Sequence, residues 1–287
     1  MTQDAAPHDV SKTRVVYTLP TADAVRIRRD QEYRVTDAGT LTMDIYYPPE
    51  AKAGSRTPAV IFVIGFSDIG ARRMLGCAMK DMGAYVSWAQ LAAASGLVAI
   101  TYTNQEPATD VHALLQYVRQ HAASLDIDEN RIGLWSCSGN VPVALSVLMR
   151  QDASAFVRCG VLSWGYMLDS GGATGVADAA RQFGFVNPCE GRSVEDLPRD
   201  IPLFVARAGR DQMPRLNESL DRFILNGLAC NLPLTFVNHA EGPHAFDLSH
   251  DSETTREVVR RMLAFLRFNL LLCVSELGAR VAPDGAP

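Results

Sequence analysis

Residues 131–140 read RIGLWSCSGN, an apolar run that ends in small residues and leads into the helix-forming stretch 141–150. Strand, tight turn and helix in this order predict a nucleophile elbow, in which the reactive side chain stands at the apex of the turn. The backbone of the apex residue is strained, so the residues two before and two after it must be small. We therefore first ask which residue stands at this apex, and then whether an acid and a base follow it in the chain.

Ser138 fits the apex best. Ser136 and Asn140 stand two positions away from it, and Asn tolerates left-handed backbone better than most residues other than Gly. Cys137 would have Trp135 at the first of these positions, and Ser136 would also have a large residue there. The usual motif is G-x-S-x-G, and this chain replaces both outer glycines, so an ordinary polar loop after a buried strand is the alternative.

Length, charge and cysteine content limit the class of protein. The chain has 287 residues, 47% of them hydrophobic, and carries a formal net charge of −5. We expect one large domain, without the clustered Lys and Arg that nucleic acids or anionic membranes attract. The six cysteines show no C-x-x-C spacing, and no H-E-x-x-H motif is present, so we expect no disulfide framework, no metal and no cofactor.

Both ends of the chain differ from its centre. Residues 1–14 are polar and lack the basic and apolar regions of a secretory signal, which predicts a flexible segment and a cytoplasmic protein. Residues 276–287 resemble a flexible tail, and the domain is expected at 15–275. The apolar stretch 263–274 is too short to span a bilayer and is interrupted by Arg267, so a docked helix explains it better.

The first strands alternate between apolar and polar residues. Residues 24–35 and 40–47 show this pattern around a turn at 37–39, which predicts a half-exposed antiparallel hairpin. Continuous apolar runs follow, separated by helical patterns, as expected for parallel strands that are buried on both faces. The sum is an α/β fold with about eight strands, mostly parallel after the N-terminal hairpin, and helices on both faces. The apolar runs are 59–64, 97–102, 132–135, 157–163, 203–206 and 234–238.

Two connections, 66–80 and 167–200, are longer than simple crossovers. Each follows a predicted parallel strand, so each should lie over the carboxyl ends of the strands, where ligands bind in open α/β sheets. A small cap insertion over a site is the functional interpretation of 167–200, and added packing surface is the alternative. Its glycine-rich part, 170–175, lacks the Lys-Ser/Thr ending of a phosphate loop.

A carboxylate and a histidine follow later strands. Asp211 stands in a loop after one predicted strand, and His244 stands in the loop after the next. The order Ser, Asp, His differs from the orders of trypsin-like and subtilisin-like proteases. His239, which lies nearer its strand, is the rival base, and Asp169, which follows an earlier strand, is the rival acid.

Three segments together resemble the α/β-hydrolase superfamily, in particular its serine carboxylesterases and the related dienelactone-hydrolase-like branch. DENRIGLW at 128–135 is similar to the strand before that family's nucleophile, GRD at 209–211 to its acid loop, and GPHAF at 242–246 to its histidine loop. The similarity runs from about residue 15 to about residue 272. Three ordered motifs are more specific than one, and the resemblance implies the α/β-hydrolase fold.

The resemblance also implies a role for individual residues. Ser138 would attack an acyl carbonyl, His244 would take its proton and later pass it to the leaving alcohol, and Asp211 would hold the imidazole in the productive tautomer. The backbone amides of Gly139 and Phe66 are the expected donors of an oxyanion hole.

The chain departs from the family in the loop before Phe66. Many esterases have His-Gly-Gly-Gly there, and this chain has Gly65 alone, so the second oxyanion donor stays open. Dienelactone hydrolases carry a cysteine at the apex, whereas Cys137 is displaced by one, and we expect it to pack beside the serine. Gly65, Trp164 and Tyr166 are the candidates for binding substrate, with core packing as the alternative for the two aromatic residues.

The expected function is hydrolysis of short-chain carboxylic esters through an acyl-enzyme intermediate. The alternatives are a peptidase, a dienelactone or carbon–carbon bond hydrolase on the same fold, and a ligand receptor with slow turnover, because a fold does not fix the leaving group. The expected partner is a small-molecule ester, with no nucleic acid and no membrane, and the chain is expected to be a monomer or a homodimer.

Overall fold

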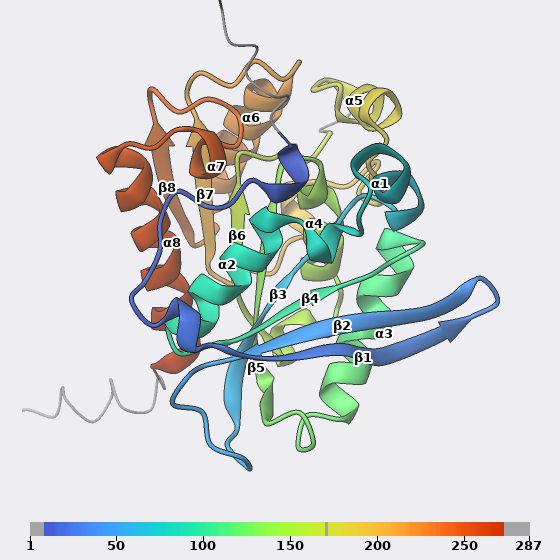
Figure 1. Cartoon of the computed structure of the whole chain (residues 1–287). Helices are drawn as coiled ribbons and strands as arrows, with labels where there is room; N and C mark the ends of the chain where they lie inside the picture. Colours follow the sequence, from blue (N-terminus) through green and yellow to red (C-terminus); the bar gives the residue numbers. More distant parts are fainter. Residues whose placement is uncertain (1–8, 170–171, 273–287) are drawn as a thin grey trace, which may run out of the picture.

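Eight strands form one sheet at the centre of the structure, a computed structural model that describes residues 9–169 and 172–272. The predicted tail at 276–287 lies outside these residues. The strand order is β1-β2-β4-β3-β5-β6-β7-β8 (Figure 1). The strands are β1 (Arg26–Thr36), β2 (Gly39–Tyr47), β3 (Thr57–Phe62), β4 (Val98–Tyr102), β5 (Ile127–Cys137), β6 (Val157–Ser163), β7 (Leu203–Ala208) and β8 (Leu234–His239).

The strand directions confirm the predicted mixed sheet. β1 and β2 form an antiparallel hairpin, β2 is antiparallel to β4, and every later pair is parallel. Residues of β4 and the carboxyl-terminal half of β5, 132–137, are buried throughout, which explains why these strands appear in the sequence as continuous apolar runs. The carboxyl ends of the parallel strands therefore meet at one edge of the sheet.

Helices cover both faces of this sheet (Figure 1). α2 (Gly83–Ala94) and α8 (Glu253–Leu271) lie on one face, and α3 (Pro107–Gln120), α4 (Val141–Leu148) and α6 (Leu216–Ala229) lie on the other. A Cβ atom on Gly133 of β5 would come within 3.0 Å of Leu270 of α8, so the glycine allows this helix to approach the sheet. Helices on both faces were predicted from the sequence and are confirmed.

The carboxyl edge carries three short helices. α1 (Asp68–Leu75) and α5 (Val176–Phe183) lie beside each other on one side of it, and α7 (Phe246–Ser249) lies on the other side (Figure 1). α1 belongs to the long connection 66–80, and α5 belongs to the connection 167–200. The cap-like insertion is thus one helix with flanking turns.

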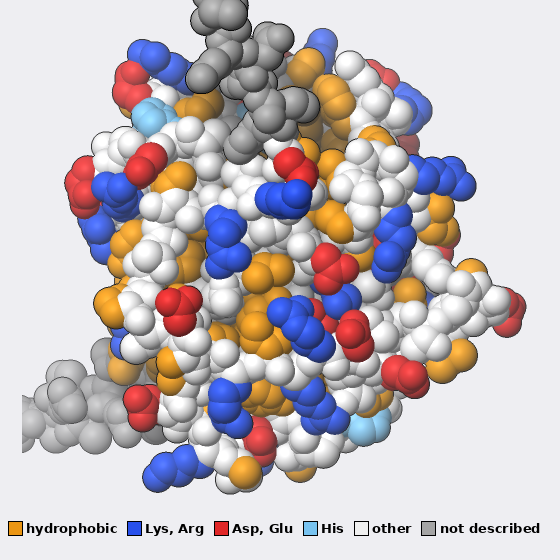
Figure 2. Space-filling view, in the orientation of Figure 1, with side chains coloured by type: hydrophobic (Ala, Val, Ile, Leu, Met, Phe, Trp, Pro, Cys, Tyr) orange, Lys and Arg blue, Asp and Glu red, His pale blue; other side chains and the backbone are white. Residues whose placement is uncertain are grey.

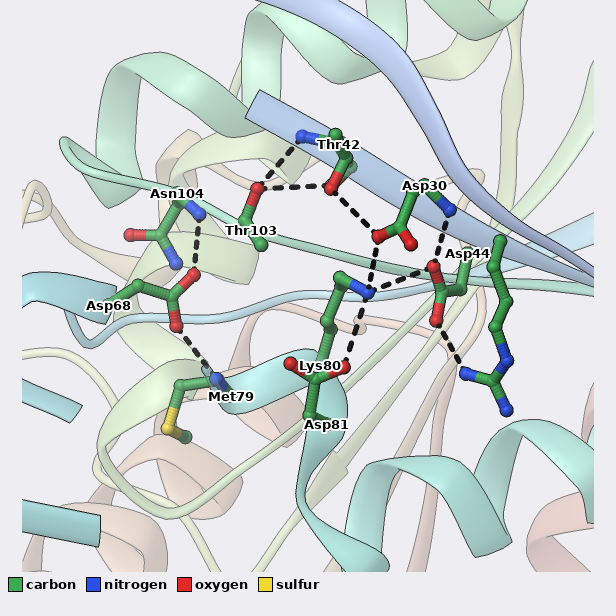
Figure 3. Close-up of polar contacts among 10 residues, drawn as sticks. Asp30, Thr42, Asp44, Asp68, Met79, Lys80, Asp81, Thr103 and Asn104 are labelled. Atoms are coloured by element: carbon green, nitrogen blue, oxygen red, sulfur yellow. Dashed lines mark hydrogen bonds and ion pairs between the residues drawn. The ribbon is translucent and has the colours of Figure 1, made fainter. Parts of the chain in front are cut away.

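An ion-pair cluster fixes the end of the connection 66–80 to the N-terminal hairpin (Figure 3). The ammonium group of Lys80, with 6% of its side chain exposed, lies 2.9 Å from Asp44, 3.1 Å from Asp30 and 3.2 Å from Asp81. Asp44 is fully buried and also accepts a hydrogen bond from Arg29. A buried carboxylate needs such partners, because an unpaired charge away from water is costly.

Asp68 holds the beginning and the end of the same connection together (Figure 3). Its carboxylate accepts the backbone N–H of Met79 at 2.7 Å and that of Asn104, which follows β4, at 2.8 Å. α1 and the turn at Met79–Asp81 are therefore anchored over the end of β4.

The first described residues lie against α2. A Cβ atom on Gly83 would come within 2.6 Å of the Lys12 carbonyl oxygen, and the Val15 amide donates to the hydroxyl of Ser87 at 3.0 Å. The Val16 amide then donates to the carbonyl of Asp247 at 2.9 Å. The part of the segment 1–14 that the structure describes is thus in contact with the domain.

On the face shown in Figure 2, Lys and Arg side chains are interspersed with Asp and Glu side chains. That face therefore presents no large field of one sign. Among residues 9–169 and 172–272, none of the helices has the length and apolar character that crossing a membrane requires.

Candidate active site

Ser138 stands at a sharp turn between β5 and α4. Its φ is +53°, a left-handed conformation that non-glycine residues seldom adopt, whereas Cys137 before it is extended with φ −144°. A 3-10 turn at Ser138–Asn140 leads directly into α4. This strand–turn–helix geometry is that of a nucleophile elbow.

Ser138, His244 and Asp211 form a continuous chain of hydrogen bonds. The Ser138 hydroxyl oxygen lies 3.1 Å from Nε2 of His244, and Nδ1 of His244 lies 2.8 Å from Oδ2 of Asp211. The Asp211 side chain is fully buried, while 28% of the His244 side chain is exposed. The structure thus brings together the three residues that the sequence singled out, and leaves the histidine accessible.

The acid and histidine loops fit against each other without side chains between them. A Cβ atom on Gly209 would overlap the carbonyl of Ala240, and the Arg210 amide donates to the Gly242 carbonyl at 2.9 Å. The second oxygen of Asp211 accepts the Met213 amide at 2.8 Å. These contacts give the carboxylate a fixed orientation toward the imidazole.

The rival base and acid have other partners. His239 is 1% exposed, its Nε2 lies 2.9 Å from the Thr255 hydroxyl, and burial lowers the pKa of its imidazole. Asp169 accepts hydrogen bonds from the Thr174 side chain at 2.8 Å and the Ala177 amide at 3.1 Å, which organises the start of α5. Neither residue contacts Ser138 or His244 among the described residues.

Cys137 points away from the apex. It is buried, and its sulfur lies 3.7 Å from the side-chain nitrogen of Asn140. Burial raises the pKa of the Cys137 thiol well above its usual value, so the thiol stays protonated at neutral pH. A buried, protonated thiol is a poor nucleophile, and its position agrees with packing beside Ser138.

The loop after β3 approaches the elbow through Gly65. A Cβ atom on Gly65 would lie 2.6 Å from the Gly139 carbonyl oxygen and 2.8 Å from Cα of Asn140. The Gly65 amide donates to the side-chain oxygen of Asn140 at 2.7 Å, and the Gly65 carbonyl accepts the Val186 amide at 2.8 Å. Gly65 therefore allows close backbone packing of this loop against the elbow.

The amide of Phe66 is left free by this arrangement. The Ile64 amide donates to the Tyr102 hydroxyl at 3.2 Å, and the Phe66 carbonyl accepts from Asn104 at 3.1 Å. Within the described part of the chain, the Phe66 amide has no protein acceptor. Gly139 is the second residue of the 3-10 turn, where amides lack partners within the helix. Two amides beside Ser138 are thus available to a developing oxyanion.

Asn140 has a role that the sequence did not reveal. Its φ is −84°, so it makes no use of the tolerance for left-handed backbone that was expected to favour it. Its side-chain nitrogen donates to the Cys137 carbonyl at 2.8 Å and to the Tyr85 hydroxyl at 3.0 Å, while its oxygen accepts from Gly65. Asn140 therefore joins the elbow to the loop that carries the Phe66 amide.

The two aromatic residues expected in the pocket are both nearly buried. Trp164 packs its ring edge-on against His244, with 4.8 Å between ring centroids. Tyr166 donates its hydroxyl to the Pro214 carbonyl at 2.9 Å and stacks on Phe185 at 5.1 Å. Trp164 supports the histidine, and Tyr166 stands behind Phe185, a residue that the sequence did not single out.

Asp247 is a buried carboxylate close to this centre. One of its oxygens accepts the indole N–H of Trp88 at 2.7 Å, which places Trp88 in the core between α2 and β5. Burial raises the pKa of Asp247 to about 6. In the described part of the chain, no group of three or more His, Cys, Asp or Glu side chains is placed to hold a metal ion.

Two of the solved structures that are similar to this chain are esterases. A thermophilic esterase from the planctomycete Thermogutta terrifontis is 16% identical with a TM-score of 0.62, and the similarity covers 93% of this chain and 97% of that one. One of two esterases from the fungus Rhizomucor miehei is 14% identical with a TM-score of 0.66, covering 91% of this chain and 87% of that one. The chain therefore has the α/β-hydrolase fold. No protein-family model and no curated protein matches the sequence.

We expect Asp247→Asn to change how stability depends on pH. Because the folded state raises the pKa of this carboxyl from 3.8 to about 6, the folded protein binds the proton more tightly than the unfolded chain. The wild type should therefore lose stability relative to the Asn variant as the pH rises from about 4 to about 6, by up to about 3 kcal/mol, with no further change above this range. Urea unfolding of both proteins between pH 4 and 8 measures the difference, with the exposed Asp37→Asn as control. Parallel curves for the wild type and Asp247→Asn would contradict the expectation.

Proposed function

We propose that this protein is a serine hydrolase that cleaves carboxylic esters with short acyl groups through an acyl-enzyme intermediate. The observation that carries the proposal is the unbroken chain from the Ser138 hydroxyl through His244 to Asp211, set on a left-handed turn beside two available amides. A nucleophile, a base with an orienting acid, and an oxyanion site are the groups that acyl transfer needs.

Each group has one task in this mechanism. The Ser138 oxygen attacks the ester carbonyl while Nε2 of His244 accepts its proton, and Asp211 stabilises the imidazolium that forms. The bond to the alcohol then breaks, and His244 gives its proton to the leaving oxygen. Water attacks the remaining acyl-serine by the same route in reverse, with His244 again as base, which releases the acid and restores Ser138.

The negative charge of each tetrahedral intermediate falls on the former carbonyl oxygen. The amides of Gly139 and Phe66 are proposed as its donors, because Gly65 brings the two segments into direct backbone contact. This assignment gives the second donor a physical basis, since the Phe66 amide has no protein acceptor among the described residues.

The known ligands of a similar structure agree with a short acyl group. Esterase 2 of Thermogutta terrifontis has been solved with propionate and with butyrate bound, and also in forms modified by paraoxon and by tabun. Propionate and butyrate have three and four carbons, which supports esters of small acyl groups as the substrates to test first for this chain.

The first test compares the two neighbouring candidate nucleophiles. We expect Ser138→Ala to lower kcat for p-nitrophenyl acetate roughly 10⁵-fold, because the loss of a triad nucleophile removes the covalent route. Cys137→Ala should keep most of the activity, since the thiol is buried and protonated. A fluorophosphonate should label the wild type at Ser138 alone, as read by peptide mass spectrometry. Labelling at Cys137, or full activity in Ser138→Ala, would refute the proposal.

The second test concerns the acid and the base. His244→Ala should be nearly inactive, and Asp211→Asn should lose on the order of 10⁴ in kcat because it favours the wrong imidazole tautomer. Asp169→Asn, whose carboxylate contacts α5, is the matched control for the acid and should remain active. Steady-state rates with p-nitrophenyl acetate measure all three. A greater loss in Asp169→Asn than in Asp211→Asn would move the acid to the earlier strand.

The third test concerns Asn140 as a positioning residue. Asn140→Ala removes the acceptor of the Gly65 amide, so the Phe66 amide should lose its fixed direction and kcat should fall about 10- to 100-fold with little change in KM. Tyr85→Phe is the matched control. It removes the hydroxyl that accepts from the Asn140 side-chain nitrogen, and it leaves the bond between the Asn140 oxygen and the Gly65 amide in place. If Asn140→Ala folds with a wild-type melting temperature and keeps its kcat, Asn140 does not position the loop.

A further inference from the structure

Two aromatic rings close the space directly above Gly139. A Cβ atom on Gly139 would lie 2.7 Å from the ring of Phe185 and 2.9 Å from the ring of Phe66. The two rings meet edge to face, with 6.1 Å between their centroids. We call Phe66 and Phe185 the aromatic wall.

The aromatic wall is held from behind. Phe185 stacks on Tyr166, whose hydroxyl is bonded to the Pro214 carbonyl. The backbone after Phe185 is fixed as well, because the Val186 amide donates to the Gly65 carbonyl at 2.8 Å. Phe185 itself is 5% exposed. The Phe185 ring therefore has little freedom to swing aside.

A largely apolar cavity of about 480 Å³, which Phe66 lines, lies between α1 and α5. Its apolar walls come from aliphatic, methionine and phenylalanine side chains, with Ser67, Arg181 and Gln182 as polar members, and Asp68 anchors the turn that carries Met79 (Figure 3). Its volume falls in the range of small-molecule sites, which are mainly apolar. The residues that characterise it are Phe66, Gly70, Met74, Met79, Met82 and Phe183.

The chemistry of the proposed reaction decides which part of an ester meets the aromatic wall. The leaving oxygen must lie within reach of Nε2 of His244, and the carbonyl oxygen must lie at the amides of Gly139 and Phe66. The acyl chain then extends to the side away from His244. Figure 1 shows α1 and α5 on that side of β5, and α7, which follows His244, on the opposite side.

We propose that the aromatic wall sets the acyl-chain limit of this enzyme by separating the acyl site from a cavity that could hold a longer chain. The inference rests on the proposed ester hydrolysis and adds its specificity-determining residues. Chain length is limited by two removable side chains, and the volume for a longer chain is already present behind them. Opening the aromatic wall should convert a short-chain esterase into one that accepts medium chains.

The experiment compares kcat/KM for p-nitrophenyl acetate and octanoate in purified full-length variants. In the wild type, octanoate should be at least about 100-fold poorer than acetate, because chains that meet a wall are strained. Phe185→Ala and Phe66→Ala should each raise the octanoate-to-acetate ratio at least about 30-fold, since every methylene that becomes buried adds about fourfold. Phe185→Leu and Phe66→Leu serve if the alanine variants do not fold, and circular dichroism checks folding.

Refilling the cavity provides the decisive control. Gly70 lines the cavity, and a Cβ atom there would meet nothing within 4 Å, so the position accepts a side chain and Gly70→Phe is chosen to fill the cavity with a ring. Combined with Phe185→Ala, it should return the octanoate-to-acetate ratio to near the wild-type value. Phe183→Ala, which enlarges the cavity without opening the aromatic wall, should leave the wild-type ratio unchanged.

Three results would overturn the inference and are distinct from one another. An active wild type whose ratio does not change in either wall variant shows that the wall does not limit the chain. A gain that persists in Phe185→Ala/Gly70→Phe shows that the longer chain lies elsewhere. A wild type that hydrolyses none of these esters overturns the proposed function, and the specificity inference with it.

Discussion

The left-handed backbone of Ser138 is the constraint on which the rest of the site depends. A non-glycine residue in this conformation costs on the order of 1–3 kcal/mol and persists only when its surroundings fix it. The surroundings here are other backbone segments: Gly65 lies against the Gly139 carbonyl, and the Tyr166 amide donates to the Ser138 carbonyl at 3.1 Å. Gly165 allows the second contact, because a Cβ atom there would overlap Val141. The ends of β3, β5 and β6 thus hold this conformation in place, and the first two carry the amides beside the hydroxyl.

Much of the fold could be predicted from sequence because its signals are local. Continuous apolar runs identify buried parallel strands, and the alternating run at 24–35 identifies the half-exposed hairpin. The placement of Ser138 at the apex could also be predicted, since the size of the residues two positions away is a local property. His244 and Asp211 were identified by their position after strands of a known fold type. The structure then showed their side chains within hydrogen-bonding distance of each other.

Contacts between distant segments could not be predicted in the same way. Asn140 was interpreted from its backbone preference, but its side chain bonds Gly65, which lies 75 residues earlier. Trp164 and Tyr166 were singled out as aromatic residues after a strand, yet Phe185 from the cap-like insertion lies in front of Tyr166 and takes the place above Gly139. Composition identifies which segments can cover a site. The three-dimensional packing decides which ring faces it.

The first described residues and the histidine loop meet through one hydrogen bond, from the Val16 amide to the Asp247 carbonyl. Nearly the whole chain lies between them, and Asp247 follows His244 by only three positions. During synthesis the segment around Val16 leaves the ribosome long before Asp247 and gains this partner only when the histidine loop has followed. The contact that joins the two segments is therefore a late one. A nascent chain that ends before residue 244 contains Ser138 but lacks its proposed base.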